Sequence, residues 1–211
     1  MRIESLLPPG QPGKPWTLTL EGGKTLRLGE GVVIDFALYQ GKELEEDLLA
    51  DLEQAAFAAG LRERAVSLLT GRLLSAGTLR EKLLAKGGSE AQVEDIIRWA
   101  EDIGLLNDEE YAKALARHYQ AKGYGIYKIK DELYRRQVPR EYWEEALAQL
   151  EAPDEIIDRF LAKKLTDPED RKQVKKASDA LVRRGFTWSQ VSSGIERFRR
   201  EFDDTHIGEH T

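Results

Sequence analysis

The 211-residue sequence contains no cysteine, one methionine, three histidines and seven prolines. Without cysteine there is no disulfide framework, no thiolate nucleophile and no cysteine-ligated zinc, which favours a reducing, cytoplasmic environment. No run approaches the roughly eighteen apolar residues that a membrane-spanning helix needs, and the start MRIESLLPPG lacks the apolar core of a secretion signal, so we expect no membrane partner. Few prolines and a charged fraction of 33% favour a helix-rich protein.

Catalytic and cofactor motifs are also missing. The sequence has no G-x-x-x-x-G-K-[ST] phosphate loop, no H-E-x-x-H zinc motif and no G-x-S-x-G nucleophile elbow. Its histidines are His118 within a predicted helix and His206 and His210 in the C-terminal tail, and no other ligands converge on them. We therefore expect a protein that is not an enzyme and that holds no metal and no cofactor.

Charge is unevenly distributed along the chain. The net charge is −6, and residues 1–61 hold five Lys and Arg against ten Asp and Glu, whereas the other 150 residues hold 27 against 28. A protein that is acidic as a whole is not drawn to nucleic acid by its net charge. Any contact with nucleic acid must then come from local basic patches.

The first sixty residues carry the β signal. WTLTLEGGKTLRL, residues 16–28, alternates apolar and polar positions on both sides of Gly22-Gly23, which predicts a hairpin with a tight turn. Residues 32–34 could add a third strand, and residues 42–60 predict a helix that ends at Gly60. We expect this acidic N-terminal segment, residues 1–60, to modulate the affinity for a partner and not to create it.

The remaining chain predicts a mainly α fold of tandem three-helix repeats. Shifts of about 50 and 48 residues align Leu83, Leu133 and Leu181, and a period of this length is typical of repeat proteins. The predicted repeats are residues 61–106, 107–152 and 153–204, followed by a flexible tail at 205–211. Expected helix starts are Ser89, Asn107 or Asp108, and Pro139.

The stretch AKGYGIYKIK, residues 121–130, has three candidate roles: a phosphate loop, a nucleic-acid contact or a joint between helices. A phosphate loop would follow a strand and open a helix, and this stretch follows a helix. Gly123 is expected to end that helix, and Gly125 to allow the turn into the next one. The same joint would display Tyr124, Tyr127, Lys128 and Lys130, which could stack on and neutralise a single strand.

Basic residues recur in the second and third repeats. Arg135-Arg136 aligns with Arg183-Arg184, and at about 100° per residue Lys172, Lys176 and Arg183 share one face of a predicted helix, opposite Val174, Ala177 and Leu181. A solvated face is the plain alternative to a binding face. The candidate binding residues are Lys122, Tyr124, Tyr127, Lys128, Lys130, Arg135, Arg136, Lys172, Lys175, Lys176, Arg183 and Arg184.

Residues 104–139, GLLNDEEYAKALARHYQAKGYGIYKIKDELYRRQVP, resemble the central signature of the RecX family. The preceding LREKLLAKGGSEAQVEDIIRWAEDIG resembles the first repeat of that family, and Gln137 departs from it at a position that usually holds glycine. The resemblance implies tandem three-helix repeats and a regulator that binds the RecA recombinase filament on single-stranded DNA and restrains it. We expect a monomer that binds single-stranded DNA only weakly by itself.

Two other functions stay open at this point. A helix-turn-helix protein would bind duplex DNA tightly with a sequence preference, although the predicted helix at residues 89–102 carries one Arg against five carboxylates. A helical scaffold for other proteins would show no salt-dependent affinity for DNA.

Overall fold

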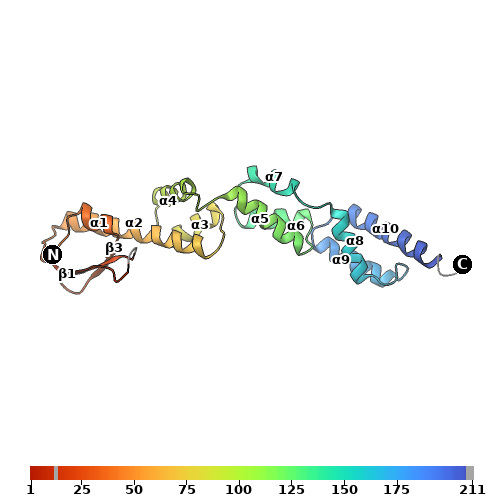
Figure 1. The fold of residues 1–211 in the computed structure, drawn as a ribbon, viewed down its shortest axis with the longest axis horizontal. Helices are drawn as coiled ribbons and strands as arrows, with labels where there is room; N and C mark the ends of the chain where they lie inside the picture. Colours follow the sequence, from red (N-terminus) through yellow and green to blue (C-terminus); the bar gives the residue numbers. More distant parts are fainter. Residues whose placement is uncertain (12–13, 208–211) are drawn as a thin grey trace. The chain divides into compact units, whose positions relative to one another are not determined.

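The computed structural model describes residues 1–11 and 14–207. The chain divides into two compact units (Figure 1). The N-terminal unit comprises Met1–Leu73 and Leu79–Leu106, and the C-terminal unit comprises Leu74–Thr78 and the chain from Asn107 onward. Helices dominate both units, which confirms the mainly α fold.

A three-stranded antiparallel sheet begins the N-terminal unit. Its strands are β1 (Ile3–Leu7), β2 (Trp16–Leu20) and β3 (Thr25–Leu28), in the order β1-β2-β3. The predicted hairpin is confirmed: Trp16 pairs with Leu28 and Leu18 with Leu26. Gly22 and Gly23 form the turn at φ of 93° and 82°, a region that glycine enters without steric cost. The inward side chains bury Ile3, Leu18, Leu20 and Leu28.

The third strand is not the one expected. Residues 32–34 lie in the short helix α1 (Glu30–Asp35), which buries Val33 and leaves Ile34 exposed. β1 pairs with β2 instead, and its short segment before two prolines lacks a regular alternation of apolar and polar residues.

The expected helix end at Gly60 is wrong. Helix α2 (Glu46–Gly71) runs through Gly60 for 26 residues and buries apolar side chains on both sides of it: Leu52, Ala56, Leu61, Ala65 and Leu69. A glycine inside a helix costs only about 1 kcal/mol, less than these buried contacts contribute. The repeat boundary that we placed after residue 60 therefore falls inside one continuous helix.

Two further helices complete the N-terminal unit, α3 (Ala76–Leu84) and α4 (Glu90–Asp102). The first turn of α3 belongs to the C-terminal unit. Ser89 caps α4 as expected, because its side chain accepts a hydrogen bond from Gln92 N while the Gln92 side chain accepts one from Ser89 N.

The C-terminal unit holds two three-helix bundles with separate cores. The first contains α5 (Asp108–Ala121), α6 (Ile126–Arg135) and, after a 3-10 turn at Arg140–Tyr142, α7 (Trp143–Ala148). The second contains α8 (Pro153–Lys164), α9 (Arg171–Arg183) and α10 (Trp188–Ile207). Asn107, one of the two expected caps, starts α5. α10 extends through residue 207 into the predicted flexible tail, and residues 208–211 lie outside the described part.

The aligned leucines confirm the repeat. Leu83, Leu133 and Leu181 are all fully buried. In each case the residue four positions later has a left-handed backbone, with φ of 89°, 54° and 90° at Gly87, Gln137 and Gly185 respectively. The second helix of every repeat thus ends in the same left-handed turn, even where glutamine replaces glycine.

The course of α2 gives a prediction for Gly60. A Cβ atom added there meets no atom within 4 Å, so Gly60→Ala removes the conformational cost of glycine without a clash. We expect the N-terminal unit to gain about 0.5–1 kcal/mol in its free energy of unfolding. Urea denaturation followed by circular dichroism measures the change, and a loss of stability would contradict a continuous helix.

Candidate binding surface

The stretch 121–130 joins two helices and also joins the two C-terminal bundles. Gly123, at φ 78°, follows the end of α5 as predicted. Gly125 N then donates a hydrogen bond to Arg184 O at 2.8 Å, and Tyr127 N donates one to Gly185 O at 3.3 Å. The start of α6 is therefore docked on the end of α9 by main-chain atoms.

Gly125 is needed for this contact and not for the turn. Its φ of −82° and ψ of 171° are open to any residue, so the reason we gave for this glycine is wrong. A Cβ atom on Gly125 would overlap the carbonyl group of Gly185 and lie 2.9 Å from Phe186 N. The close approach of two backbones is what excludes a side chain here.

The first turn of α3 meets the end of α6 in the same way. Ser75 Oγ donates a hydrogen bond to Arg136 O, as does Thr78 Oγ1 at 3.1 Å. A Cβ atom on Gly77 would overlap the side chain of Gln137. The same docking contact thus occurs twice in the C-terminal unit. The start of α6 contacts the left-handed end of α9, and the start of α3 contacts the left-handed end of α6.

Arg184 and Tyr124 lie inside the joint. One terminal nitrogen of Arg184 donates to Lys122 O at 3.2 Å and to Gly123 O at 3.3 Å. Its guanidinium carbon lies 5.7 Å from the ring centroid of Tyr124 and 5.0 Å from that of Phe160. These contacts place two of the twelve candidate residues in a structural role.

Arg136 also stabilises the fold. Its terminal nitrogens donate to the hydroxyl groups of Tyr111 at 3.5 Å and Tyr119 at 3.4 Å, and one lies 3.8 Å from the buried carboxylate of Glu132. The hydrogen bond with Tyr119 raises the pKa of Arg136, although partial burial opposes the shift. Tyr119 in turn donates to Glu132 at 2.9 Å, which closes the network.

Lys128 and Arg135 form ion pairs on the surface of α6. Lys128 Nζ lies 3.1 Å from Asp131 and 3.5 Å from Glu132, and the hydrogen bond to Asp131 raises the pKa of Lys128. Arg135 lies 3.5 Å from Asp131, and 63% of its side chain is exposed. Pairs with the exposed carboxylate of Asp131 are weak, so both cations can exchange Asp131 for a ligand.

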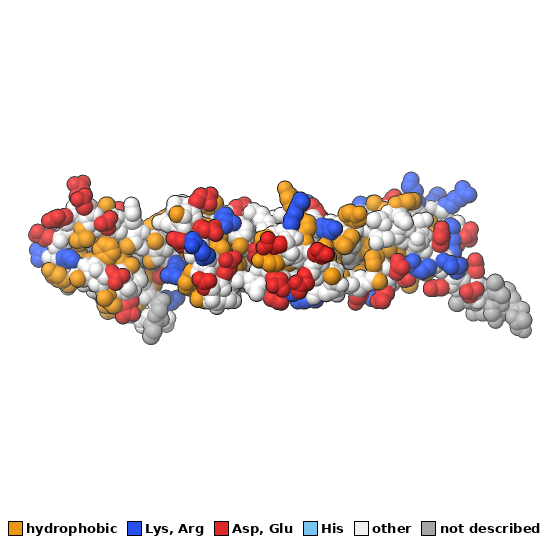
Figure 2. Space-filling view, turned by 90° about the horizontal axis from the view of Figure 1, so that it is seen from above, with side chains coloured by type: hydrophobic (Ala, Val, Ile, Leu, Met, Phe, Trp, Pro, Cys, Tyr) orange, Lys and Arg blue, Asp and Glu red, His pale blue; other side chains and the backbone are white. Residues whose placement is uncertain are grey.

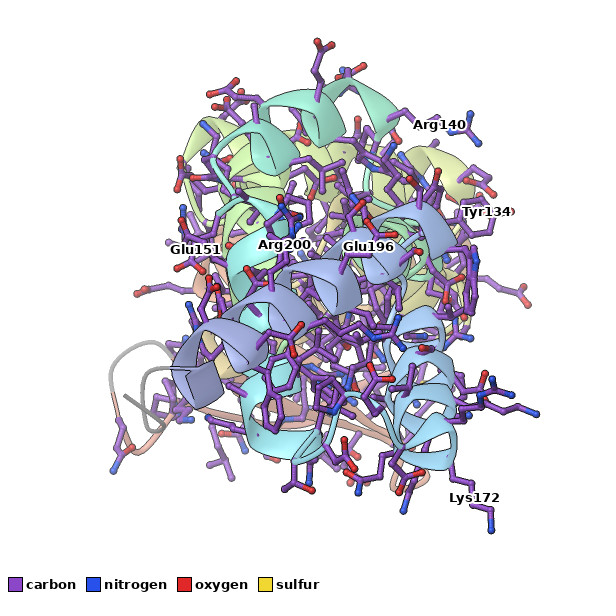
Figure 3. The ribbon with its side chains drawn as sticks, turned by 90° about the vertical axis from the view of Figure 1, so that its right-hand side faces the viewer. Tyr134, Arg140, Glu151, Lys172, Glu196 and Arg200 are labelled. Carbon is purple, nitrogen blue, oxygen red and sulfur yellow. The ribbon has the colours of Figure 1, made fainter. Side chains whose placement is uncertain are left out.

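Six candidate cations are exposed and form no salt bridge with any residue that the structure describes. They are Lys122, Lys130, Lys172, Lys175, Lys176 and Arg183. Four of them lie on α9, whose opposite face buries Ala177 and Leu181, so the predicted division of this helix is confirmed. Lys172 extends away from the body of the protein (Figure 3). Lys and Arg side chains, with Asp and Glu among them, lie over the part of the chain that carries α9 and α10 (Figure 2).

A hollow of about 480 Å³ between α8 and α9 adjoins these cations. Its wall includes Lys164, Lys176 and Arg184, and no Asp or Glu is among the described residues that line it. Lys164 was missed in the sequence, although its position in a Lys-Lys pair at the end of a predicted helix was a usable signal. A concave site with several cations and no carboxylate suits a phosphate group.

Two exposed tyrosines extend the candidate surface along α6. Tyr127 and Tyr134 are 59% and 67% exposed and lie seven residues apart, which places them on one helix face with Lys130 between them. Figure 3 shows Tyr134 directed outward. Sequence reasoning missed Tyr134, and its spacing from Tyr127 was the signal that could have identified it. Exposed aromatic rings beside cations suit stacking on the bases of a single strand.

In the described chain, no group of three or more His, Cys, Asp or Glu side chains is placed to hold a metal ion. Of the helices described, none is both long and apolar enough to cross a bilayer.

Comparisons with known proteins match this architecture. The family model for the second three-helix domain of RecX matches residues 107–147. The Regulatory protein RecX of Vibrio parahaemolyticus is 31% identical over 138 residues, which cover 64% of this chain and 88% of that protein. The protein of the same name from Bacillus licheniformis is 26% identical over 82% of this chain and 68% of its own length. A crystal structure of regulatory protein RecX shares the fold, with a TM-score of 0.68 and 23% identity over 93% of this chain and 98% of that one.

The adjacent arginines of α6 give a matched pair of variants. Arg136→Ala removes the donor to two tyrosine hydroxyls and one of the cations beside Glu132, so we expect a loss of about 1–2 kcal/mol in the free energy of unfolding of the C-terminal unit. Arg135→Ala removes a largely exposed side chain whose ion pairs, to Asp131 at 3.5 Å and Glu132 at 3.7 Å, are long, so the free energy of unfolding should change by less than about 0.5 kcal/mol. Urea denaturation of both variants tests this, and equal losses would contradict the two roles.

The contact at Gly125 predicts a second effect. Gly125→Ala forces the start of α6 away from Gly185, so we expect the amide protons of Gly125 and Tyr127 positions to exchange faster with solvent while the two bundle cores stay protected. Hydrogen exchange measured by NMR resolves these amides. Unchanged protection at both would show that the two backbones are not in close contact.

Proposed function

Because the chain belongs to the RecX family of regulatory proteins, we propose that it binds a RecA-type recombinase filament on single-stranded DNA as a monomer and inhibits the recombinase. The family supplies the regulatory role, and the choice of partner and the inhibitory effect are our inference. The observation that carries the proposal is the row of exposed cations on α9 beside the cationic hollow between α8 and α9.

The filament offers a suitable counterpart to this surface. Its groove combines DNA phosphates with the side chains of protein subunits, and local cations on an acidic protein can bind such a surface at short range. Exposed Tyr127 and Tyr134 add stacking for bases that are not paired. Each contact is weak, and many contacts made together give a useful affinity.

Inhibition would follow from occupancy. A chain that lies in the groove blocks the addition of recombinase subunits or the conformational change that strand exchange needs. The main-chain hydrogen bonds between α6 and α9 support this mechanism, because they hold the cations of both bundles in one arrangement before binding. No catalytic group is required for any of these steps.

The two alternatives have less support. A helix-turn-helix protein needs a basic recognition helix, whereas α4 carries one Arg and five carboxylates and α7 is six residues long with Glu144 and Glu145 in its first turn. A scaffold without a nucleic-acid partner leaves the clustered cations of α9 unexplained. Binding to filaments, to bare single strands and to duplexes across a salt series distinguishes all three functions.

The central test reverses the charge of α9. In the variant Lys172→Glu, Lys176→Glu and Arg183→Glu, we expect co-sedimentation with recombinase filaments at low salt to weaken by about tenfold or more. The slope of log affinity against log salt should become shallower by about 2, because about 0.7 counterion is released per phosphate contact on a single strand. Circular dichroism and thermal melting should change little, since all three side chains are exposed.

A charge-retaining variant is the matched control. Lys172→Arg, Lys176→Arg and Arg183→Lys keep the three charges, so filament binding and its salt slope should stay close to those of the parent. Equal binding by the parent and the charge-reversed variant would remove α9 from the interface. A parent protein that does not co-sediment with filaments at any salt concentration would refute the proposed function itself.

A further inference from the structure

The outer edge of β3 carries main-chain groups without a strand partner. β3 is an edge strand, since the order is β1-β2-β3. Leu20 N donates to Lys24 O, so the alternation of an antiparallel ladder directs the N–H and C=O groups of Leu26 and Leu28 toward β2 and those of Thr25 and Arg27 outward. No hydrogen bond to these outward groups occurs among the described residues. An edge of this kind can accept another extended segment.

A groove runs between this edge and α2. It has a volume of about 650 Å³ and is bordered by Thr25, Leu26 and Arg27 on one side and by α2 on the other. Phe57 and Leu61 give it an apolar floor, and 43% of Phe57 is exposed. Gly60 leaves the floor open, since a Cβ atom there meets nothing within 4 Å. We call this site the β3 groove.

Positive charge borders the β3 groove. Arg27, Arg64 and Lys86 line it and form no salt bridge with the described residues. Of the two acids in its wall, Glu53 is paired with Lys24 at 2.5 Å, and Glu63 forms no salt bridge with a described residue. Arg27 belongs to the acidic residues 1–61, which hold ten Asp and Glu against five Lys and Arg, whereas Arg64 and Lys86 follow that segment in the sequence.

We propose that the β3 groove binds an extended, acidic segment of a partner protein, which pairs with β3 as a fourth strand. The outward groups of Thr25 and Arg27 include both donors and acceptors, which a peptide backbone satisfies together. Alternate side chains of the segment pack on Phe57 and Leu61. Its carboxylates lie against the bordering cations. This site is separate from the α9 surface, and it adds a protein contact to the proposed regulator.

Other occupants fit the groove less well. A second copy that paired its own β3 with this one would bring two sets of Arg27, Arg64 and Lys86 together, and like charges across such a pair are destabilising. A nucleic-acid strand carries phosphates, which the outward carbonyl groups of Thr25 and Arg27 repel. It also lacks the backbone donors that these carbonyls need.

A labelled peptide tests the proposal with the full-length protein. The probe is a fluorescein-labelled decapeptide of alternating valine and aspartate, and its binding is measured by fluorescence anisotropy. We expect saturable binding that is at least about tenfold tighter than that of the matching valine and lysine peptide, because the groove is cationic. A parent protein that binds neither peptide, or both equally, overturns the proposal.

Two variants locate the binding site. Gly60→Glu places a carboxylate on the groove floor at an exposed helical position, and Thr25→Pro removes an outward N–H while the bonds to β2 remain. Each should weaken binding of the valine and aspartate peptide by about tenfold or more. Gln54→Glu adds the same charge to exposed α2 surface outside the groove and serves as the control. Thermal melting verifies that each variant is folded.

The remaining outcomes identify a different occupant. Binding that survives both Gly60→Glu and Thr25→Pro in folded protein places the peptide elsewhere and refutes the assignment. If the parent protein sediments as a dimer and the Thr25→Pro variant sediments as a monomer, the edge of β3 is assigned to a second copy of the chain. If a single-stranded oligonucleotide displaces the peptide from the parent protein, and the oligonucleotide binds Gly60→Glu less tightly than the parent, the groove is assigned to nucleic acid.

Discussion

The hydrogen bond from Gly125 N to Arg184 O connects the two C-terminal bundles and determines what their surfaces can present. Main chains approach this closely because neither Gly125 nor Gly185 has a side chain. A similar contact is made at the other end of α6. There the Ser75 hydroxyl, in place of a main-chain amide, donates a hydrogen bond to Arg136 O. There Gln137 adopts a left-handed backbone that costs a non-glycine residue about 1 kcal/mol, so the docking must stabilise the unit by more than this strain.

The same geometry explains why the paired arginines divide their roles. Each pair follows a fully buried leucine, with the first arginine two residues later and the second three residues later. On a helix these offsets correspond to about 200° and 300°, so the first arginine faces away from the core and the second lies within about 60° of the leucine. Arg135 and Arg183 are accordingly exposed, whereas Arg136 and Arg184 turn into hydrogen-bond networks. Helical periodicity alone could have separated them.

Local patterns predicted the features that depend on neighbouring residues. The hairpin at Gly22-Gly23, the cap at Ser89, the burial of the aligned leucines and the exposed face of α9 all follow from spacings of a few residues. Features that depend on distant contacts were missed. β1 is a strand because it pairs with β2, and α2 continues through Gly60 because its buried residues outweigh the cost of one glycine. Gly125 is constrained by a backbone sixty residues away in the sequence.

The candidate site was predictable to a similar extent. Charge and periodicity identified the cations of α9, but not which basic residues are engaged elsewhere. Lys128 is ion-paired within its own helix, with Asp131 and Glu132. Their spacing of three and four residues permits such pairs, but it does not show whether the side chains are held elsewhere by other contacts. The hollow between α8 and α9 is formed by packing, so no linear pattern predicts that Lys164 lies beside Lys176.

Short-range electrostatics reconcile a net charge of −6 with the proposed binding to an anionic partner. At physiological ionic strength charges are screened beyond about 8 Å, so the five exposed lysine and arginine side chains of α9 act on a ligand at this helix more strongly than the net charge of the chain does. Each exposed contact contributes at most about 1 kcal/mol. Such contacts add up only if they form together without a large loss of conformational entropy. In the proposed function the glycine-dependent docking of α6 on α9 would matter, because it fixes the cations and tyrosines of two bundles in one arrangement before a partner arrives.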